Sequence, residues 1–273
     1  MLDLSIITIN YKTNELTRAC IDSVKKYTKD IKFETIIIDN SEDNRGFAGG
    51  NNVGIKKAKG RYILLLNSDT YLHDDVLSKM VSYMDKNPEV GISSCSLKNV
   101  DGTPQVTGGH FPTLVKVLFW MVLQDFPGME GLIGQFHPKK NGDGITDMDW
   151  VGGTFFMIRH DMVRNVGLFD DSYFMYTEEV DFCFRAKKLG WRVSYAPVGS
   201  ITHIGGASSK SSEFVVLSEI KGIKIFFKKH FSKWQYPILR LILKIGALGR
   251  IILFGILKGG EYAKIYAKAF WQA

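Results

Sequence analysis

The sequence predicts an α/β fold in which a mixed, mostly parallel sheet is flanked by helices and followed by a C-terminal amphipathic helical tail. Strand-like apolar runs alternate with helical segments, which is typical of parallel strands joined by right-handed crossovers. The run at residues 62–66 is continuously apolar, as in a strand buried on both faces, and it leads to a polar tip carrying Asp69. Because ligands of open α/β sheets bind beyond the carboxyl ends of the strands, this tip is a candidate site.

Alternating elements account for the first part of the chain. Asn14 is a candidate N-cap for the first helix, and Asn87-Pro88 ends a later one. The predicted strands cover residues 4–10, 33–39, 61–67 and 90–95, and the predicted helices cover residues 14–28, a short segment ending at Lys59, and 74–87.

The second part of the chain begins with a change of character. Residues 100–148 have many Gly and Pro, an apolar patch at residues 114–123 and no steady period, so we expect an irregular insertion or a mobile lid. The remaining predicted elements are a strand at 150–158, a helix from His160, a helix at 178–189 closed by Gly190, and a strand at 191–195. The sequence thus predicts a domain over residues 1–210, with halves at 1–99 and 100–210, and a tail at 211–273.

The basic charge of the chain is concentrated in this tail. The formal net charge is +7, yet residues 211–273 hold 11 Lys and Arg against 3 Asp and Glu. The rest of the chain is near neutral, which argues against nucleic-acid binding and favours attachment of the tail to an anionic surface.

A helix over residues 238–258 would gather four basic residues within an arc of about 120°. They are Arg240, Lys244, Arg250 and Lys258. This pattern predicts a basic amphipathic helix lying in the interface of an anionic membrane. The alternative is a helix docked on its own domain or on a second subunit.

The cysteines and the first residues indicate a reducing compartment. Cys20, Cys95 and Cys183 are far apart in apolar or helical contexts, so neither a disulfide framework nor a CxxC metal site is predicted. The chain from Met1 resembles a first strand rather than a signal peptide.

Two carboxylates stand at the carboxyl ends of predicted strands. Asp39 ends the strand at 33–39, and Asp69 follows the strand that ends at Asn67. A carboxylate in the place of Asp39 can bind a base or a ribose. A carboxylate in the place of Asp69 is a suitable ligand for Mg²⁺ or Mn²⁺ shared with substrate phosphates. Structural alternatives stay open: Asp39 could form an Asx turn with Ser41, and Asp69 could cap the next element.

A loop rich in glycine and asparagine is predicted over residues 44–54, with its four glycines at residues 46–54. Glycines allow main-chain N–H groups to approach a diphosphate, with a helix N-terminus behind them. The segment matches neither GxGxxG nor GxxxxGK[ST], which argues against a dinucleotide oxidoreductase and an ATPase. A flexible strand-to-helix connection is the alternative.

Acidic and aromatic residues alternate at 176–185. Thr177 is a candidate N-cap for a helix whose first turn holds Glu178, Glu179 and Asp181. Acids there complement the helix dipole, but the interleaved aromatic residues would also desolvate them and raise a carboxyl pKa toward that of a general base. We favour the second interpretation.

His203 follows a strand and stands in a Gly-rich, polar loop. Beside Asp69 it would complete a divalent-metal site of imidazole and carboxylate. Singly, it would be a surface or packing histidine.

Together these residues resemble glycosyltransferase family 2, the inverting enzymes with the GT-A fold, in the branch that includes bacterial rhamnosyltransferases. The resemblance runs from about residue 4 to about residue 208. Two positions depart from the family's pattern: Asn67 takes the first place of the DxD-type metal motif, and Glu178-Glu179 replaces the usual Glu-Asp pair. The matching segments are Ser5–Tyr11 (opening strand), Ile38–Ser41 (base-binding Asp), Asn44–Asn52 (donor loop), Asn67–Asp69 (metal motif), Trp150–Gly153 (acceptor side), Glu178–Arg185 (ED-x-D-x-x-x-R) and His203 (late metal-associated His).

The resemblance implies a role for each matching residue. Glu179 is the expected base, with Glu178 as the alternative and Asp181 as a further catalytic residue; Asp69 and His203 are the expected metal ligands. The expected acceptor residues are Trp150, Gly152 and Gly153. The expected nucleotide-sugar-binding residues are Thr8, Asn10, Tyr11, Asp39, Asn40, Arg45, Gly46, Phe47, Gly50, Asn51, Asn67 and Ser68.

The implied function is inverting transfer of a sugar, with rhamnose as a candidate, from a nucleotide-diphosphate donor to a glycan or lipid-linked acceptor in surface-polysaccharide synthesis. The implied cofactor is a divalent metal, Mn²⁺ or Mg²⁺. The expected location is the cytoplasm, at the inner face of the cell membrane, and a homo-oligomer is left open. Two rival functions are a non-catalytic nucleotide-sugar-binding scaffold and a sugar-phosphate nucleotidyltransferase. The basic Gly-rich N-terminal signature expected of a nucleotidyltransferase is missing from this sequence.

Overall fold

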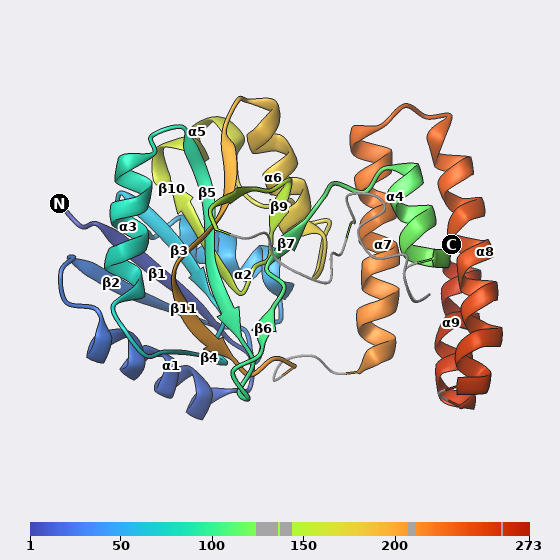
Figure 1. The fold of residues 1–273 in the computed structure, drawn as a ribbon, viewed down its shortest axis with the longest axis horizontal. Helices are drawn as coiled ribbons and strands as arrows, with labels where there is room; N and C mark the ends of the chain where they lie inside the picture. The colour runs from blue at the N-terminus through green and yellow to red at the C-terminus, as the bar shows by residue number, and fades with distance from the viewer. Residues whose placement is uncertain (124–135, 137–143, 207–210, 258) are drawn as a thin grey trace. The chain divides into compact units, whose positions relative to one another are not determined.

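The structure is a computed structural model that describes residues 1–123, 136, 144–206, 211–257 and 259–273 (Figure 1). The chain divides into two compact units. The first comprises Met1–Gly108, Lys140–Asp171 and Glu179–Ser208, and the second comprises Gly109–Lys139, Ser172–Glu178 and Ser209–Ala273. These units are defined by how their residues pack and do not show which segments fold independently. The predicted domain boundary at residue 210 therefore stays a prediction.

Among the described residues, the first unit is built on a nine-stranded mixed sheet. Seven strands follow the order β2-β1-β3-β10-β5-β11-β4, and the other two, β6 and β8, pair with β5 and β11. β1 pairs in parallel with β2 and β3, and β5 with β11, whereas β10 runs antiparallel between β3 and β5. The predicted mixed, mostly parallel sheet is therefore confirmed. The strands are β1 (Leu4–Asn10), β2 (Phe33–Asp39), β3 (Tyr62–Leu66), β4 (Thr70–Leu72), β5 (Val90–Lys98), β6 (Pro104–Gln105), β8 (Thr146–Asp147), β10 (Phe155–Arg159) and β11 (Arg192–His203).

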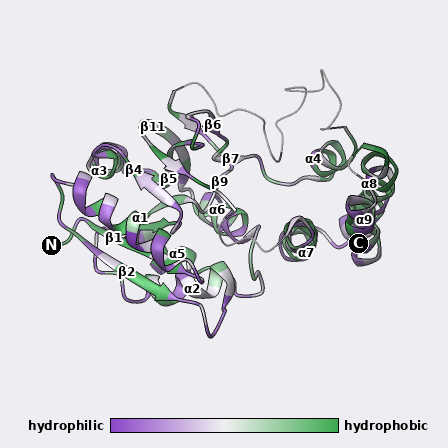
Figure 2. Cartoon of the chain, turned by 90° about the horizontal axis from the view of Figure 1, so that it is seen from below, coloured by the Kyte–Doolittle hydropathy of each residue, from purple (hydrophilic) through white to green (hydrophobic). Residues whose placement is uncertain are grey.

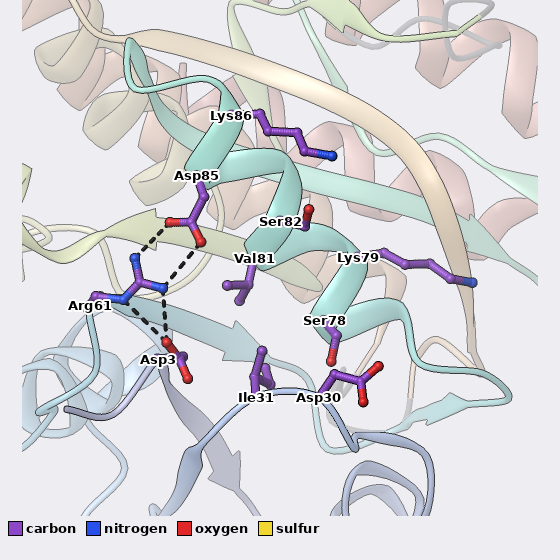
Figure 3. A pocket seen from close by; sticks show the side chains of 10 residues that line it. All are labelled: Asp3, Asp30, Ile31, Arg61, Ser78, Lys79, Val81, Ser82, Asp85 and Lys86. Carbon is purple, nitrogen blue, oxygen red and sulfur yellow. Dashed lines mark hydrogen bonds and ion pairs between the residues drawn. The ribbon is translucent and has the colours of Figure 1, made fainter.

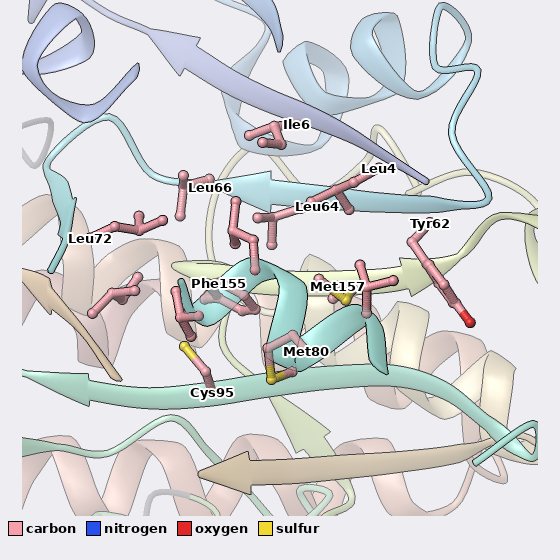
Figure 4. Close-up of a cluster of buried hydrophobic side chains, with 14 of the residues drawn as sticks. Leu4, Ile6, Tyr62, Leu64, Leu66, Leu72, Met80, Cys95, Phe155 and Met157 are labelled. Atoms are coloured by element: carbon pink, nitrogen blue, oxygen red, sulfur yellow. The ribbon is translucent and has the colours of Figure 1, made fainter. Parts of the chain in front are cut away.

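Helices cover this sheet and bury its apolar faces. A cluster of buried hydrophobic residues includes Leu64 and Leu66 of β3, Met80 of α3, and Phe155 and Met157 of β10 (Figure 4). α3 begins at a capped end, where the Asp75 side chain accepts from a backbone N–H of the first turn over 3.2 Å. The helices of this unit are α1 (Asn14–Tyr27), α2 (Gly46–Ile55), α3 (Val76–Lys86), α5 (His160–Val166) and α6 (Glu178–Lys188), the last beginning at the boundary between the units.

Several element boundaries differ from those predicted. α1 has Thr13 and not Asn14 at its N-cap position. The predicted strand at 150–158 is two strands, β9 (Trp150–Val151), which pairs with β7 (Gly108–Gly109), and β10. β5 and β11 are longer than predicted because each gains a partner at its far end: β6 adds to β5, and β4 adds to β11.

The second unit is helical. It contains α4 (Leu114–Leu118), the π-helix η1 (Phe119–Leu123), α7 (Ser212–His230), α8 (Gln235–Leu257) and α9 (Gly260–Gln272). α4 and η1 pack against α8, where a Cβ at Gly246 would lie 3.2 Å from Met121 Cγ. The prediction that residues 114–123 lack regular structure is therefore wrong; much of the predicted lid, residues 124–135 and 137–143, lies outside the described residues.

The predicted basic residues do not share one exposed face of α8: Arg240 is exposed, Lys244 is half-buried and Arg250 is buried, and Lys258 lies outside the described residues. Arg250 is 8% exposed, donates to Trp120 O over 2.6 Å and lies over the rings of Trp120 and Tyr266. Arg240 donates to Ala273 O over 2.7 Å, and Lys244 lies over the Phe270 ring. These contacts match the alternative of a helix docked on its own chain.

The outer face of α8 is apolar instead, and the helix is largely green in Figure 2. Among the described residues, no helix combines the length and apolarity needed to cross a bilayer. Leu257, the last residue of α8, is 68% exposed; the other exposed aliphatic residues of the helix are Ile238, Leu241, Ile245, Leu248, Ile252 and Ile256, with exposed fractions from 41% to 79%. The spacing of these other residues places them within about 80° of one another around the helix, so they form one stripe.

Candidate active site

The carboxyl ends of β1 and β2 place Asn10 beside Asp39. The two are register partners, and Asn10 Nδ2 donates to Asp39 Oδ1 over 3.4 Å. The Ser41 N–H donates to the same oxygen over 2.9 Å, which is the Asx turn left open by the sequence. Hydrogen bonds from Ser41, and then from Asn10, hold the pKa of the exposed Asp39 carboxyl below its usual range. Asp39 is thus an ionised acceptor open to a ligand.

The segment after β3 is held against the end of β1. Thr13 Oγ1 lies 3.1 Å from Ser68 Oγ, and the Thr13 N–H donates to Asn10 Oδ1 over 3.2 Å. On its other side, the Asn67 N–H donates to Thr154 O over 3.0 Å. These contacts bring the ends of β1 and β3 and the loop before β10 to one edge of the sheet.

Asp69 and His203 lie together at this edge. β4 pairs with the end of β11, so that Thr70 is opposite His203, and the Ile204 N–H donates to Asp69 O over 3.0 Å. This pairing puts His203 Nε2 3.3 Å from Asp69 Oδ1. Gln105 Oε1 lies 2.8 Å from His203 Nδ1 and orients the imidazole ring.

The Asp69–His203 pair fits a divalent cation. Neighbouring ligand atoms of an octahedral ion with bonds near 2.1 Å lie roughly 3 Å apart, close to the 3.3 Å between these side chains. A carboxylate oxygen and an imidazole nitrogen are suitable ligands for Mn²⁺. In the described ranges, no cluster of three or more His, Cys, Asp or Glu is present, so water or donor phosphate would complete the coordination.

The glycines of α2 allow the helix to pack closely on the sheet. The helix begins at Gly46, whose φ is 68°, and Asn40 Nδ2 donates to Gly46 O over 2.9 Å. A Cβ at Gly50 would lie 3.0 Å from Asn40 Nδ2, and one at Gly54 would lie 3.1 Å from Ile7 Cγ1. The prediction of a loop over residues 44–54 is therefore wrong for most of its length.

Other predicted donor-binding residues differ in exposure. Arg45 is exposed and forms an ion pair with Asp43 over 2.7 Å, and Tyr11 is partly exposed. Thr8 is buried, and its Oγ1 has no hydrogen-bond partner among the described residues. Asn51 is also buried, and its Nδ2 donates to a main-chain carbonyl of α2 over 3.0 Å. Arg45 and Tyr11 are accessible to a ligand, whereas Asn51 supports α2 from inside.

An aromatic stack connects α2 to α6. A Cβ at Gly153 would lie 2.6 Å from the Phe47 ring, and Phe47 contacts Phe169 edge to face at 6.3 Å between centroids. Phe169 stacks on Phe182 at 4.6 Å, and Phe182 is one turn beyond Glu179. The predicted donor, acceptor and catalytic segments are thus linked through direct contacts.

The predicted acceptor segment is fixed from both sides. The Gly152 N–H donates to Thr107 O over 2.6 Å, and Trp150 is 6% exposed. Lys187 Nζ of α6 lies 3.0 Å from Asp149 Oδ1. This segment therefore has a defined position relative to α6.

Asn52 ties α2 to the segment before α6. Its Nδ2 donates to Phe169 O over 2.9 Å and to Asp171 Oδ1 over 2.6 Å, and its Oδ1 accepts from the Phe169 N–H over 2.9 Å. Asn52 is 5% exposed, so Asn52→Leu would leave two buried main-chain groups unpaired. We expect this change to lower the free energy of unfolding by roughly 3 kcal/mol. Urea unfolding would measure it against Asn165→Leu on the exposed face of α5; equal effects would contradict the expectation.

The acids of α6 differ in their surroundings. Asp181 is fully buried and accepts from Arg185 Nε over 2.8 Å, and Arg185 also donates to the carbonyls of Val166 and Leu168. Asp181 and Arg185 therefore position α6 and its preceding loop. Glu178 is 3% exposed, whereas Glu179 is half-buried.

A cavity of about 630 Å³ lies at the opposite ends of β1 and β3 (Figure 3). Arg61 there donates to Asp3 and Asp85, and Tyr62 Oη donates to Asp85 Oδ1 over 2.7 Å. The pKa of Asp3 is lowered mainly by the Lys32 N–H and then by Arg61, and that of Asp85 mainly by Arg61. These charges stabilise one another, so this cavity is not the candidate site.

Sequence reasoning missed several residues that hold the site together. Gln105 lies in a segment predicted to be irregular, and nothing in the sequence indicates that it pairs with His203. Thr13 is a polar residue soon after a strand end, which is a usable signal. Asn52 and Phe169 are recognisable only once α2 and the loop before α6 are placed side by side.

The chain is similar in sequence to known glycosyltransferases. A sequence model of the family described as "Glycosyltransferase like family 2" matches residues 2–218. The chain is 24% identical to the low-salt glycan biosynthesis hexosyltransferase Agl10 of Haloferax volcanii over 270 residues, covering 88% of this chain and 82% of that protein. It is 28% identical to the rhamnosyltransferase WbbL of Escherichia coli K12 over 176 residues, covering 61% of this chain and 63% of WbbL, which is less than two thirds of that relative's length.

The solved structures agree on the fold. GalNAc-T7, crystallised with UDP, GalNAc and Mn²⁺, superimposes with a TM-score of 0.61 at 12% identity, covering 98% of this chain and 55% of that one. At 12% identity, this structural similarity supports only the GT-A fold. The match to the family model is separate evidence and extends over residues 2–218. The chain therefore belongs to glycosyltransferase family 2.

Proposed function

We propose that the chain is an inverting, metal-dependent hexosyltransferase that moves a sugar from a nucleotide-diphosphate donor to a hydroxyl of a glycan or lipid-linked acceptor in surface-polysaccharide synthesis. The observation that carries the proposal is the 3.3 Å contact between Asp69 and His203 at the sheet edge that also holds Asn10 and Asp39. Relatives named hexosyltransferase and rhamnosyltransferase support hexose transfer, with rhamnose as a candidate sugar.

Each site residue has its own role in the transfer. Asp39 accepts hydrogen bonds from the base or ribose of the donor. Asp69 and His203 would hold a divalent ion, which when bound offsets the negative charge of the departing nucleoside diphosphate. Glu179 accepts the proton of the acceptor hydroxyl as its oxygen attacks the anomeric carbon. The bond from that carbon to the diphosphate breaks on the opposite side, and the diphosphate leaves with the electron pair.

Exposure favours Glu179 over Glu178 as the base. Glu178 is 3% exposed, whereas Glu179 is half-buried, so an acceptor hydroxyl reaches Glu179 more readily. A partly desolvated carboxylate is also a stronger base than one in water.

Release of nucleoside diphosphate from UDP-, dTDP- and GDP-sugars, with Mn²⁺ or Mg²⁺ and a lipid-linked glycan acceptor, tests the proposal. Metal-dependent release from one donor would support it and identify that donor. Binding of a donor without release under every condition would instead favour the scaffold. Formation of a nucleotide sugar from a sugar phosphate would favour the nucleotidyltransferase.

We further propose that the second unit attaches peripherally to an anionic membrane at the inner face of the cell, through the stripe on α8. The stripe is apolar, and the segment 211–273 around it has 11 Lys and Arg against 3 Asp and Glu. A second copy of the chain would bring the same positive charge to the contact, whereas an anionic leaflet carries the opposite charge. Attachment there suits a lipid-linked acceptor.

Leu248→Lys is expected to weaken partitioning onto vesicles of phosphatidylglycerol and phosphatidylcholine by about tenfold, because burying a leucine in an apolar phase is worth about 1.5–3 kcal/mol. Leu248 is 52% exposed, so the change should not disturb packing. Val100→Lys, at a 73% exposed turn of the first unit, is the matched control in sedimentation with vesicles. Equal partitioning of both variants would reject membrane attachment through the stripe, and loss of a dimer in Leu248→Lys would favour a second copy.

A further inference from the structure

The turn that leads into α6 is strained. Tyr176 has a φ of 72° and Thr177 a φ of 77°. Positive φ is a genuine outlier for a β-branched residue such as Thr177. Strained conformations of this kind persist only where the surrounding structure holds them, and they cluster at functional sites. Here the strained pair directly precedes Glu178 and Glu179.

Hydrogen bonding by the Thr177 side chain does not hold the turn. Thr177 is 3% exposed, and its Oγ1 has no hydrogen-bond partner within the described part of the chain. The sequence predicts that Thr177 caps α6; this prediction is wrong, because that hydroxyl accepts no N–H of the helix. The buried side chain is therefore held by packing.

α7 supplies this packing. A Cβ at Gly222, in the middle of α7, would lie 2.7 Å from Thr177 Cβ and 2.9 Å from Tyr176 O. The helix can therefore lie directly on the turn only because residue 222 has no side chain. Phe214, near the start of α7, adds ring contacts to Phe174 at 6.3 Å and to Tyr176 at 6.4 Å.

From these contacts we infer that Gly222 and Thr177 are positioning residues: α7 holds the strained turn and thereby fixes the direction in which Glu178 and Glu179 enter α6. All the contacts lie within the second unit, which contains residues 172–178 and 209–273. α7 thus influences the placement of the acids through the turn that directly precedes them. The catalytic part of this inference rests on the proposed function, whereas its structural part does not.

Gly222→Ala tests the inference in the full-length chain. A methyl group at residue 222 would displace α7 or the turn. We expect faster hydrogen exchange confined to the backbone amides of residues 176–182. We also expect a fall in kcat of about tenfold to 100-fold, the range that a misplacement near 1 Å can produce, with the donor KM within about twofold of wild type. Gly249→Ala is the matched control, because a Cβ at Gly249 in α8 meets nothing within 4 Å.

Thr177→Gly provides a second variant in case Gly222→Ala does not fold. Glycine adopts positive φ without strain, so this variant should be as stable to heat as wild type. It lacks the packed side chain, so exchange at residues 176–182 should still rise and kcat should still fall. In the double variant Thr177→Gly/Gly222→Ala, the methyl group at residue 222 occupies the space that the Thr177 side chain leaves. The exchange rate at residues 176–182 and kcat should therefore both be closer to wild type than in Gly222→Ala alone.

Two results would overturn the inference: exchange at residues 176–182 that stays at the wild-type rate in both single variants, or exchange that rises equally throughout the chain. If exchange rises locally while wild type releases no nucleoside diphosphate from any donor, the proposed function fails and the role of α7 in holding the turn stands. If wild type is active and local exchange rises without a fall in kcat, the positioning role fails while the transferase proposal stands.

Discussion

Glu179→Gln is expected to lower kcat for sugar transfer by about 10²- to 10⁴-fold, the usual contribution of a general base. Glutamine keeps the size and most of the polarity of the side chain but cannot accept the proton of the acceptor hydroxyl. Glu179 is half-buried at the start of α6, one turn from the Phe182 ring that stacks on Phe169. The change should therefore leave the placement of α6 intact and remove only the chemistry.

Donor binding separates loss of chemistry from loss of structure in this experiment. Calorimetric titration with the active donor should give the same Kd for wild type and Glu179→Gln, while release of nucleoside diphosphate falls. Glu261→Gln, on the exposed first turn of α9, is the matched control and should retain wild-type rates. A larger fall in Glu178→Gln than in Glu179→Gln would move the base to Glu178, and wild-type turnover in both would remove this pair from the mechanism.

The sequence predicts the central strands well because their signal is local. β1 and β2 carry apolar residues up to a polar carboxyl end, and the structure gives both strands the predicted bounds, Leu4–Asn10 and Phe33–Asp39. α2 could not be predicted in this way, since glycine is among the poorest helix formers. Its helix depends on tertiary packing, in which Gly50 and Gly54 let it approach Asn40 and Ile7.

The site shows the same division between local and tertiary signals. Asp69 and His203 could each be selected from the sequence, yet their 3.3 Å separation depends on β4 pairing with the end of β11. The orientation of His203 depends on Gln105, which a two-residue strand places there. In the tail, helical periodicity predicts an amphipathic helix but cannot tell which face docks, so the buried position of Arg250 could not be foreseen.

Asp69→Asn is expected to lower metal-dependent transfer by about 10²- to 10³-fold, the effect of removing one electrostatic stabiliser of developing negative charge. Asn keeps the shape of Asp69 and an oxygen 3.3 Å from His203 but removes the charge that a divalent cation requires. Binding of Mn²⁺ in the presence of nucleoside diphosphate, measured by electron paramagnetic resonance, should weaken by more than about tenfold. Asp22→Asn, on an exposed face of α1, is the matched control. Because this binding is read without turnover, undiminished Mn²⁺ affinity in Asp69→Asn would reject Asp69 as a ligand even if the variant were inactive.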